Sequence, residues 1–96
     1  MKPTKSYQEG LVKYLRDPVE TAEYLNAAIE ENDLDTFLLA LRNVAEAHGM
    51  ARVSQQTKLN RVSLYRMLSR RGNPQFQNVL HLLNAWGLKL AVKPQG

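Results

Sequence analysis

Apolar residues recur at helical spacing in the first half of the chain, and this pattern predicts two consecutive helices. The first is predicted to begin at Pro18, because proline suits the first helical position and Asp17 before it is a good N-cap. Glu20 lies three residues after the cap and completes a capping box. The stripe predicted to be buried consists of Val19, Ala22, Leu25 and Ile29.

The second helix is predicted to follow Asp33, its expected N-cap, and to end at Gly49, because glycine accepts the left-handed backbone found past a helix end. His48 lies in its last turn, where the helix dipole favours a charged imidazolium. The apolar residues of this helix form a wider stripe, which consists of Leu34, Phe37, Leu38, Leu41, Val44 and Ala45.

The second half of the chain predicts three more helices and a strand. A short helix should cover residues 51–57, and Asn60 should cap a helix over residues 61–71, which ends at Gly72 and Pro74. Residues 88–93 alternate between apolar and polar positions, a pattern typical of a short strand. Before it, a helix is predicted over residues 75–86, with a buried face of Phe76, Val79, Leu80, Leu83 and Trp86.

These elements together predict one small all-α domain of five helices with a short C-terminal β-strand. We divide the chain into an N-terminal arm (residues 1–16), a helical domain (residues 17–87) and the strand (residues 88–93). The stretch "YQEGLVKYL" in the arm fits a strand, a loose turn of helix or an extended arm, and these alternatives stay open.

The formal net charge of +4 conceals an uneven distribution. Residues 1–48 contain nine acids against five bases, a balance of −4, whereas residues 49–96 contain eight bases and no acid, a balance of +8. A basic half without acids repels itself, and a polyanionic partner is the simplest reason to keep it. The charge pattern therefore indicates binding to nucleic acid, with chance in a short chain as the alternative.

Residues 50–69 have the spacing of a helix-turn-helix motif. Such a motif needs a buried residue in its first helix, here Val53, and a small residue beside it, here Ser54, so that the second helix can cross closely. The residues that would anchor the turn and the second helix to the core are Leu59, Leu64 and Met67. The alternative is a plain helical hairpin inside a bundle.

One position departs from the usual motif. The turn normally contains glycine because its backbone is left-handed, and this chain has Lys58 there. A non-glycine residue in that conformation costs roughly 1 kcal/mol, which a packed domain tolerates. We therefore expect a left-handed Lys58 and retain the motif.

The second helix of the motif would present its outward side chains to a DNA major groove. Arginine can bond guanine through two hydrogen bonds, and serine or asparagine can bond phosphates or base edges. Arginines near the end of that helix and beside the first helix suit backbone phosphates. The predicted DNA-binding residues are Arg52, Asn60, Arg61, Val62, Ser63, Tyr65, Arg66, Ser69, Arg70 and Arg71.

The sequence predicts no catalytic residues, no cofactor and no metal site. Cysteine is absent, and His48 and His81 lack the ligand spacing that zinc requires. No nucleophile–base pair, carboxylate pair or glycine-rich phosphate loop can be assembled, so we do not expect an enzyme. No apolar run approaches the roughly 20 residues of a membrane span and no secretory signal is present, so we expect a cytoplasmic protein with no membrane contact.

The chain resembles the addiction-module antidotes, HigA-like antitoxins among the prophage-type DNA-binding proteins with lambda-repressor-like domains. The resemblance covers roughly residues 14–93 and is carried above all by "DPVETAEYLNAAIEENDLDTFLLALRNVAEA", together with "SLYRMLSRRGNPQF" and "VLHLLNAWGLKLAV". Besides Lys58, Arg52 and Ser54 stand where the family often has glutamine and alanine. The resemblance implies an antitoxin that neutralises a RelE- or HigB-like ribonuclease toxin and represses its own operon.

Three expectations about partners follow. We expect a double-stranded DNA operator and a homodimer, because two motifs about 34 Å apart can read successive faces of the major groove. A ribonuclease toxin should be basic, so the acids of the first half are predicted to bind it: Glu20, Glu23, Glu30, Glu31, Asp33 and Asp35. One alternative is that these acids are an ordinary solvated face. The others are a free-standing prophage-type repressor without a toxin, and an RNA-binding module, although the few exposed aromatics lack the stacking-platform pattern that such modules use.

Overall fold

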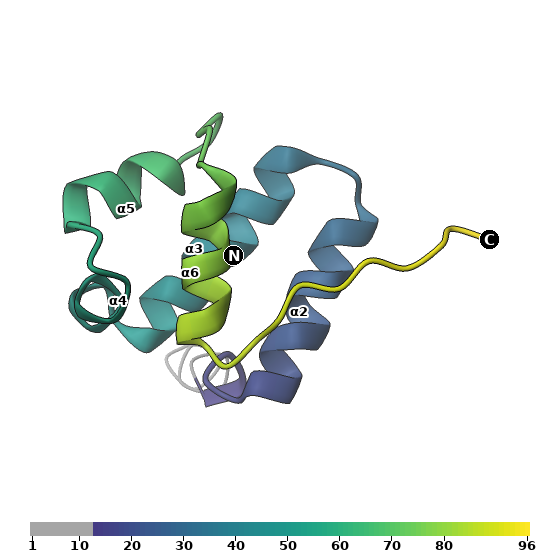
Figure 1. The fold of residues 1–96 in the computed structure, drawn as a ribbon, viewed down its shortest axis with the longest axis horizontal. Helices are drawn as coiled ribbons and strands as arrows, with labels where there is room; N and C mark the ends of the chain where they lie inside the picture. The colour runs from purple at the N-terminus through teal and green to yellow at the C-terminus, as the bar shows by residue number, and fades with distance from the viewer. Residues whose placement is uncertain (1–12) are drawn as a thin grey trace, which may run out of the picture.

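The computed structural model describes residues 13–96, so the part of the predicted arm over residues 1–12 lies outside the described range. The helices in this range are Pro18–Glu30 (α2), Leu34–His48 (α3), Met50–Thr57 (α4), Arg61–Met67 (α5) and Phe76–Ala85 (α6). Figure 1 shows α4 and α5 at one side of the molecule, α2 at the other, and α3 and α6 between them. The all-α fold is therefore confirmed for the described residues.

Helix α2 begins as predicted but buries only part of the predicted stripe. The Asp17 carboxylate accepts hydrogen bonds from the backbone N–H groups of Val19 and Glu20, at 2.9 and 3.3 Å. Val19 and Ile29, which were expected inside, are exposed. Leu25 is buried as predicted and Ala22 is half-buried, and the helix also buries Thr21 and Ala28. Thr21 can be buried because its hydroxyl donates to the Leu15 carbonyl at 2.8 Å, which satisfies both groups.

Helix α3 is the central element of the core. Asp33 caps its first turn, and Gly49 ends it with φ of 92°, as predicted. Leu34 is exposed, contrary to the prediction, and Phe37 is half-buried, whereas the rest of the predicted stripe is buried. Helix α2 lies against one side of α3 and α4 against another. The fully enclosed part of its stripe consists of Leu38, Leu41, Val44 and Ala45, each at most 1% exposed.

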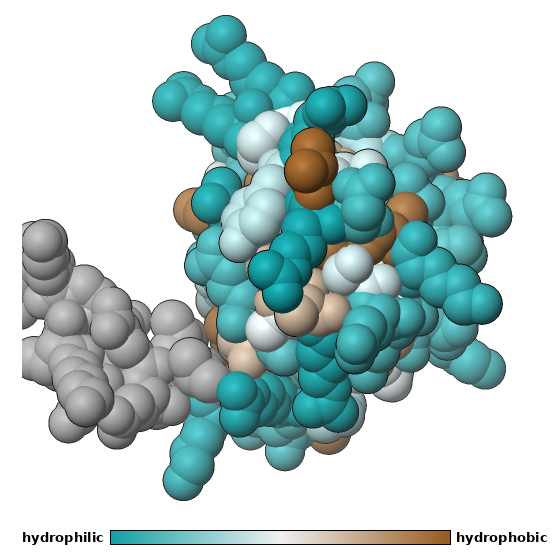
Figure 2. Space-filling model, turned by 90° about the vertical axis from the view of Figure 1, so that its left-hand side faces the viewer, coloured by the Kyte–Doolittle hydropathy of each residue, from teal (hydrophilic) through white to brown (hydrophobic). Residues whose placement is uncertain are grey.

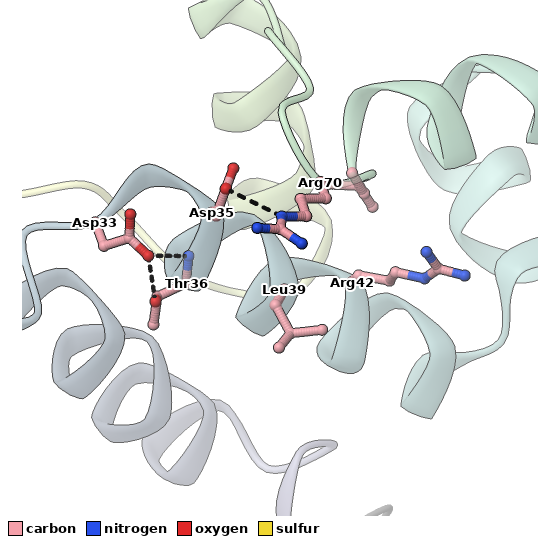
Figure 3. A pocket seen from close by; sticks show the side chains of 7 residues that line it. Asp33, Asp35, Thr36, Leu39, Arg42 and Arg70 are labelled. Atoms are coloured by element: carbon pink, nitrogen blue, oxygen red, sulfur yellow. Dashed lines mark hydrogen bonds and ion pairs between the residues drawn. The ribbon is translucent and has the colours of Figure 1, made fainter.

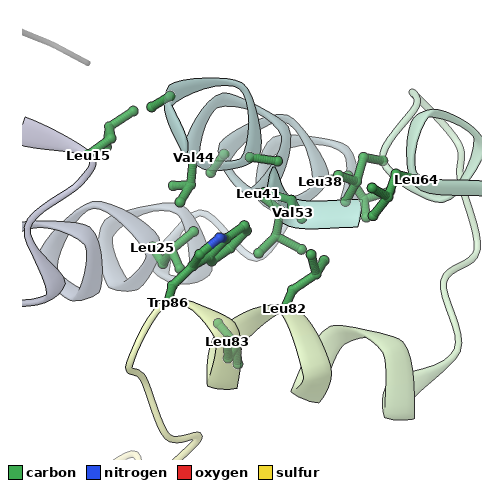
Figure 4. Packing of buried hydrophobic residues seen from close by; sticks show 14 of the residues in the cluster. Leu15, Leu25, Leu38, Leu41, Val44, Val53, Leu64, Leu82, Leu83 and Trp86 are labelled. Carbon is green, nitrogen blue, oxygen red and sulfur yellow. The ribbon is translucent and has the colours of Figure 1, made fainter. Parts of the chain in front are cut away.

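Helix α6 closes the core from the side of α4. The predicted face was partly wrong, because Phe76 and Leu80 are exposed and Val79 is half-buried. The buried residues are Leu82, Leu83 and Trp86. Figure 4 shows the Trp86 ring entering the core beside side chains from three other helices, which include Leu25 of α2, Val44 of α3 and Val53 of α4. Trp86 therefore joins the last helix to the rest of the domain.

The predicted C-terminal strand over residues 88–93 is wrong, since the described residues contain no strand. The chain turns at Gly87, with φ of 77°, and Leu88 N–H donates to the Leu83 carbonyl at 2.8 Å. After this point Leu90 and Val92 are exposed. A strand requires a neighbour that completes its ladder of backbone hydrogen bonds, and no segment between residues 13 and 96 supplies one.

His48 connects α3 to the segment before α2. Its Nε2 lies 3.1 Å from the Leu15 carbonyl, and its ring centroid is 5.7 Å from that of Trp86. Burial lowers the pKa of His48 below 6.5, against a smaller raising effect of the Leu15 carbonyl, and the charges of Arg52 and Arg16 lower it further. Partial burial and two nearby arginines therefore disfavour the charged imidazolium at this helix end, against the favourable effect of the helix dipole.

The lowered pKa of His48 predicts a loss of stability in weak acid. Because the unfolded chain binds a proton at His48 below pH 6.5 more readily than the folded chain does, the free energy of unfolding should fall as the pH falls through and below that value. Urea unfolding between about pH 7.5 and pH 5 measures this effect. His48→Gln should flatten the dependence, whereas His81→Gln, which changes an exposed histidine of α6, should not. An equally steep dependence in His48→Gln would assign it to other groups.

Candidate nucleic-acid interface

The turn between α4 and α5 has the left-handed residue that the sequence predicts. Lys58 has φ of 62° and ψ of 19°, and it ends α4. The turn is fixed by hydrogen bonds from both sides: the Thr57 hydroxyl donates to the Val53 carbonyl at 2.7 Å and accepts from Leu59 N–H at 3.3 Å. The Ser54 hydroxyl donates to the Leu59 carbonyl. These contacts offset the strain at Lys58 and fix the angle between the two helices.

Core contacts on one side of α5 determine which of its residues face solvent. Val53 and Leu64 are 0% exposed and Met67 is buried, while Leu59 is half-buried against the core. The opposite side of α5 therefore points outward, and its exposed residues are Arg61, Val62, Tyr65 and Arg66. These four were all predicted to contact DNA.

Two other predicted contact residues have a local structural role. The Asn60 side chain caps α5, because its Oδ1 accepts a hydrogen bond from Ser63 N–H at 2.7 Å. Ser63 itself is half-buried, with its side chain lining a hollow between α5 and the start of α6. The Asn60 amide nitrogen is not used by the cap, so the residue can still donate a hydrogen bond.

Helix α5 is shorter than predicted, and three predicted contact residues follow it in a loop. The helix ends at Met67, and residues 68–71 form turns. The Ser69 hydroxyl donates to the Arg66 carbonyl at 2.7 Å, and Arg71 N–H donates to the Asp35 carboxylate at 3.0 Å. The predicted helix over residues 61–71 was therefore too long, and the Arg71 amide has a carboxylate acceptor in place of a helical carbonyl. Ser69 is half-buried, and Arg70 and Arg71 are exposed.

The remaining predicted DNA contact lies on α4. Arg52 is exposed in the first turn of that helix, and its charge contributes to lowering the pKa of His48.

Figure 2 views the molecule from the side formed by α4 and α5. This face is mainly hydrophilic, with small apolar patches near its upper centre. Since residues 49–96 contain no acid, the charge that α4, α5 and the following loop contribute here is positive.

The structure adds one residue that the sequence did not indicate. Arg42, on α3, places its guanidinium carbon 5.5 Å from the centre of the Tyr65 ring and pairs with Glu46 at 3.0 Å. Its guanidinium thus lies over the ring of the exposed Tyr65 and adds a cation beside α5. No sequence signal singles it out, because its local partner Glu46 suggests only an ordinary pair along a helix.

The predicted toxin-binding acids are distributed over two helices. Glu23, Glu30 and Glu31 are exposed and Glu20 is half-buried on or beside α2. Asp33 and Asp35 instead belong to α3. The Asp33 carboxylate accepts from the Thr36 hydroxyl at 2.7 Å and from Thr36 N–H at 3.2 Å, and these bonds hold its pKa below the usual value.

Other kinds of site find no support among the described residues. Between residues 13 and 96, no group of three or more His, Cys, Asp or Glu side chains is arranged to hold a metal ion. The helices in the same range include none that is long and apolar enough to cross a membrane. The arginine-bearing face of α4, α5 and the loop after α5 is accordingly our candidate site.

Comparison with known proteins places residues 5–94 under one family model, described as "probable addiction module antidote protein". The chain is also similar to a protein of Haemophilus influenzae that bears the name "uncharacterized protein". The two are 30% identical over 83 residues, which span 86% of this chain and 86% of the relative. No solved structure matches the chain. The family match covers α2 as well as the face built by α4 and α5.

Proposed function

The chain belongs to the family of probable addiction module antidote proteins, and we propose that it is the antitoxin of a type II toxin–antitoxin module that binds operator DNA and represses its own operon. Family membership favours a regulatory role over a catalytic one and implies a toxin partner. The cytoplasm, where operator and toxin are both accessible, is the compartment that this role requires. The HigA-like subtype and the lambda-repressor-like fold are part of the proposal.

One observation carries the DNA-binding part of the proposal. Arg61 and Arg66 are both exposed on α5, a helix that is anchored to the core by Leu64 and oriented by the left-handed turn at Lys58. A short helix that presents arginines in this way fits the major groove, where arginine forms bidentate hydrogen bonds with guanine. In this interpretation α5 reads bases, while Arg52, Arg70 and Arg71 contact phosphates.

The first test is a comparison of two double variants that remove equal charge. Arg61→Ala/Arg66→Ala should abolish the preference for the operator over unrelated DNA, since each bidentate contact is worth about 1–3 kcal/mol. Arg70→Ala/Arg71→Ala should weaken binding to all sequences alike and reduce the salt dependence. Fluorescence anisotropy with the promoter fragment and an unrelated duplex measures both. An Arg61→Ala/Arg66→Ala protein that binds its promoter like the wild type would refute the assignment.

The toxin part of the proposal rests on α2. Glu20, Glu23 and Glu30 follow each other at intervals of three and seven residues, so they lie on one side of this helix, and Glu31 follows at its end. Figure 1 shows α2 at the side of the molecule away from α5. We propose that this acidic side binds a RelE- or HigB-like ribonuclease, whose RNA-binding surface should be basic. One antitoxin could then hold toxin and operator together.

Charge reversal on α2 tests this surface. Glu23→Lys/Glu30→Lys/Glu31→Lys should slow association with the toxin and relieve neutralisation, because a basic surface then meets like charge. The corresponding triple glutamine variant should show a smaller effect, and operator binding should stay at the wild-type level in both. Co-expression with the product of the adjacent gene and measurement of the association rate check this. Unchanged toxin capture would show these acids to be ordinary solvated surface.

The second candidate function is a free-standing repressor, which differs from an antitoxin in having no toxin gene beside its own. A free-standing prophage-type repressor would use the same face of α4 and α5 but would have no basic partner encoded beside it. Sequencing the neighbouring genes separates the two. The family match favours the antitoxin, because an antidote requires something to neutralise.

We further propose that the protein acts as a homodimer, joined through α6 and the tail. The segment Phe76–Ala85 contains no Asp, Glu, Lys or Arg, and Phe76, Leu80 and Leu90 are exposed. Loss of charged residues is characteristic of the centre of a protein interface. The molecule measures 39 × 33 × 25 Å, so two copies side by side can present their α5 helices about one DNA turn, roughly 34 Å, apart.

Truncation after Gly87 tests the tail as part of that interface. The truncated chain should remain folded, because Trp86 and the other buried core residues are retained. Its dimer should be weaker and should therefore dissociate at a higher protein concentration than the wild-type dimer. Sedimentation over a concentration series measures the dissociation, with circular dichroism as the control for folding. A folded, fully dimeric truncated protein would exclude the tail from the interface.

A further inference from the structure

Asp35 links the acidic half of the chain to the arginine-rich loop after α5. It lies in the first turn of α3, and its two carboxylate oxygens contact neighbouring residues of the loop, as Figure 3 shows for Arg70. Oδ1 accepts a hydrogen bond from Arg71 N–H at 3.0 Å, and Oδ2 lies 3.6 Å from the Arg70 Nε. The rest of the acidic set has no such contact with the DNA-facing side among the described residues.

The backbone of this loop is held in a conformation that its own sequence does not favour. Arg71 has φ of 63°, in the left-handed region that a residue with a side chain rarely adopts. Gly72 approaches the end of α5 so closely that a Cβ there would lie 2.5 Å from the Met67 carbonyl oxygen. In a continuing helix the Arg71 amide would bond to the Met67 carbonyl. Asp35 provides the substitute acceptor that stabilises the turned conformation.

This conformation sends two adjacent arginines to different sides of the loop. Arg71 lines the polar hollow between α5 and the start of α6, together with Arg66, Ser69 and Gln75. Arg70 lines a depression beside α3, together with Asp35 and Arg42. A hollow with two guanidinium groups and hydroxyl and amide donors suits phosphate oxygens. Arg70 and Arg71 thus lie on different sides of the loop after α5 and do not crowd the same side.

The contact between Arg70 and Asp35 is weak enough to exchange. The Arg70 side chain is 82% exposed, and ion pairs at such exposure are worth little because water screens them. A DNA phosphate offers Arg70 the same charge with shorter, charge-assisted hydrogen bonds. Asp35 therefore holds Arg70 close to the interface in the free protein and competes with the phosphate when DNA binds.

We propose that Asp35 is a positioning residue for DNA binding: it shapes the loop through the Arg71 amide and restrains Arg70 until a phosphate replaces it. The inference rests on the proposed DNA-binding function and adds to it a residue that the charge pattern alone assigns to the toxin. Asp35 therefore has two opposing effects on DNA binding. Its hydrogen bond to Arg71 N–H favours binding to the operator, because it keeps the loop in the binding conformation, whereas its negative charge lowers the affinity for DNA.

Two variants separate these effects. Asp35→Asn keeps an oxygen acceptor for Arg71 N–H but removes the charge, so at low salt it should bind the promoter fragment and an unrelated duplex more tightly to the same degree. The gain should be at most about fivefold, the limit for two unit charges about 4 Å apart in water without salt screening. Asp35→Ala also frees the loop and should lower the preference for the promoter about tenfold, the loss of one good contact. Asp17→Asn, which removes a charge but retains a helix cap at the far end of α2, should change neither.

A double-variant cycle tests whether the tighter DNA binding expected of Asp35→Asn depends on Arg70. In an Arg70→Ala background, Asp35→Asn should no longer tighten binding, because the guanidinium that the carboxylate restrains is gone. The same gain with and without Arg70 would overturn the competition, since it would then be a general effect of charge. A gain that disappears in the Arg70→Ala background supports it.

Hydrogen exchange of the Arg71 amide tests the loop without DNA. The amide should be protected in the wild type and in Asp35→Asn and should exchange at least about tenfold faster in Asp35→Ala, where it loses its acceptor. Equal exchange in all three proteins would overturn the positioning role. If the wild type binds no DNA, the proposed function fails, and this measurement still decides whether Asp35 holds the loop.

Discussion

The burial of α3 is the interaction on which the rest of the structure depends. Leu38, Leu41 and Val44 are at most 1% exposed, and α2 and α4 lie against this helix on different sides. Because its interior stripe is fixed, the polar residues on its other sides are fixed as well. Arg42 therefore meets Tyr65, and Asp35 meets the loop after α5. Helix α3, which belongs to the acidic half of the chain, thus positions Tyr65 and the loop after α5, which belong to the basic half.

Features that depend on neighbouring residues could be predicted from the sequence. The caps Asp17, Asp33 and Asn60 all bond the first turns of their helices, since capping needs only a side-chain oxygen two or three residues before an N–H group. The turn at Lys58 was predictable for a similar reason. Anchors placed on both sides of a short connection leave few backbone conformations, and the left-handed one is adopted even without glycine.

Features that depend on distant residues could not be predicted. The helix expected to reach Arg71 ends at Met67, and the Arg71 amide donates instead to Asp35, which lies 36 positions away in sequence. The tail has the alternation of a strand but no strand beside it, and alternation gives no information about partners. The apolar spacing of α6 was real, but several neighbouring faces of that helix are apolar, and only the packing on α4 decides that Leu82 rather than Phe76 is buried.

The same long-range contacts change how the charge division of the chain should be understood. The sequence places nine acids in one half and an acid-free basic segment in the other, which suggests two independent surfaces. The fold keeps the glutamates of α2 apart from α5 but brings Asp35 into contact with Arg70 and Arg71. The Asp35 carboxylate beside Arg70 and Arg71 costs electrostatic attraction for DNA, but it also accepts a hydrogen bond from the backbone amide of Arg71, whose conformation is strained. That hydrogen bond makes the orientation of the two arginines part of the fold itself.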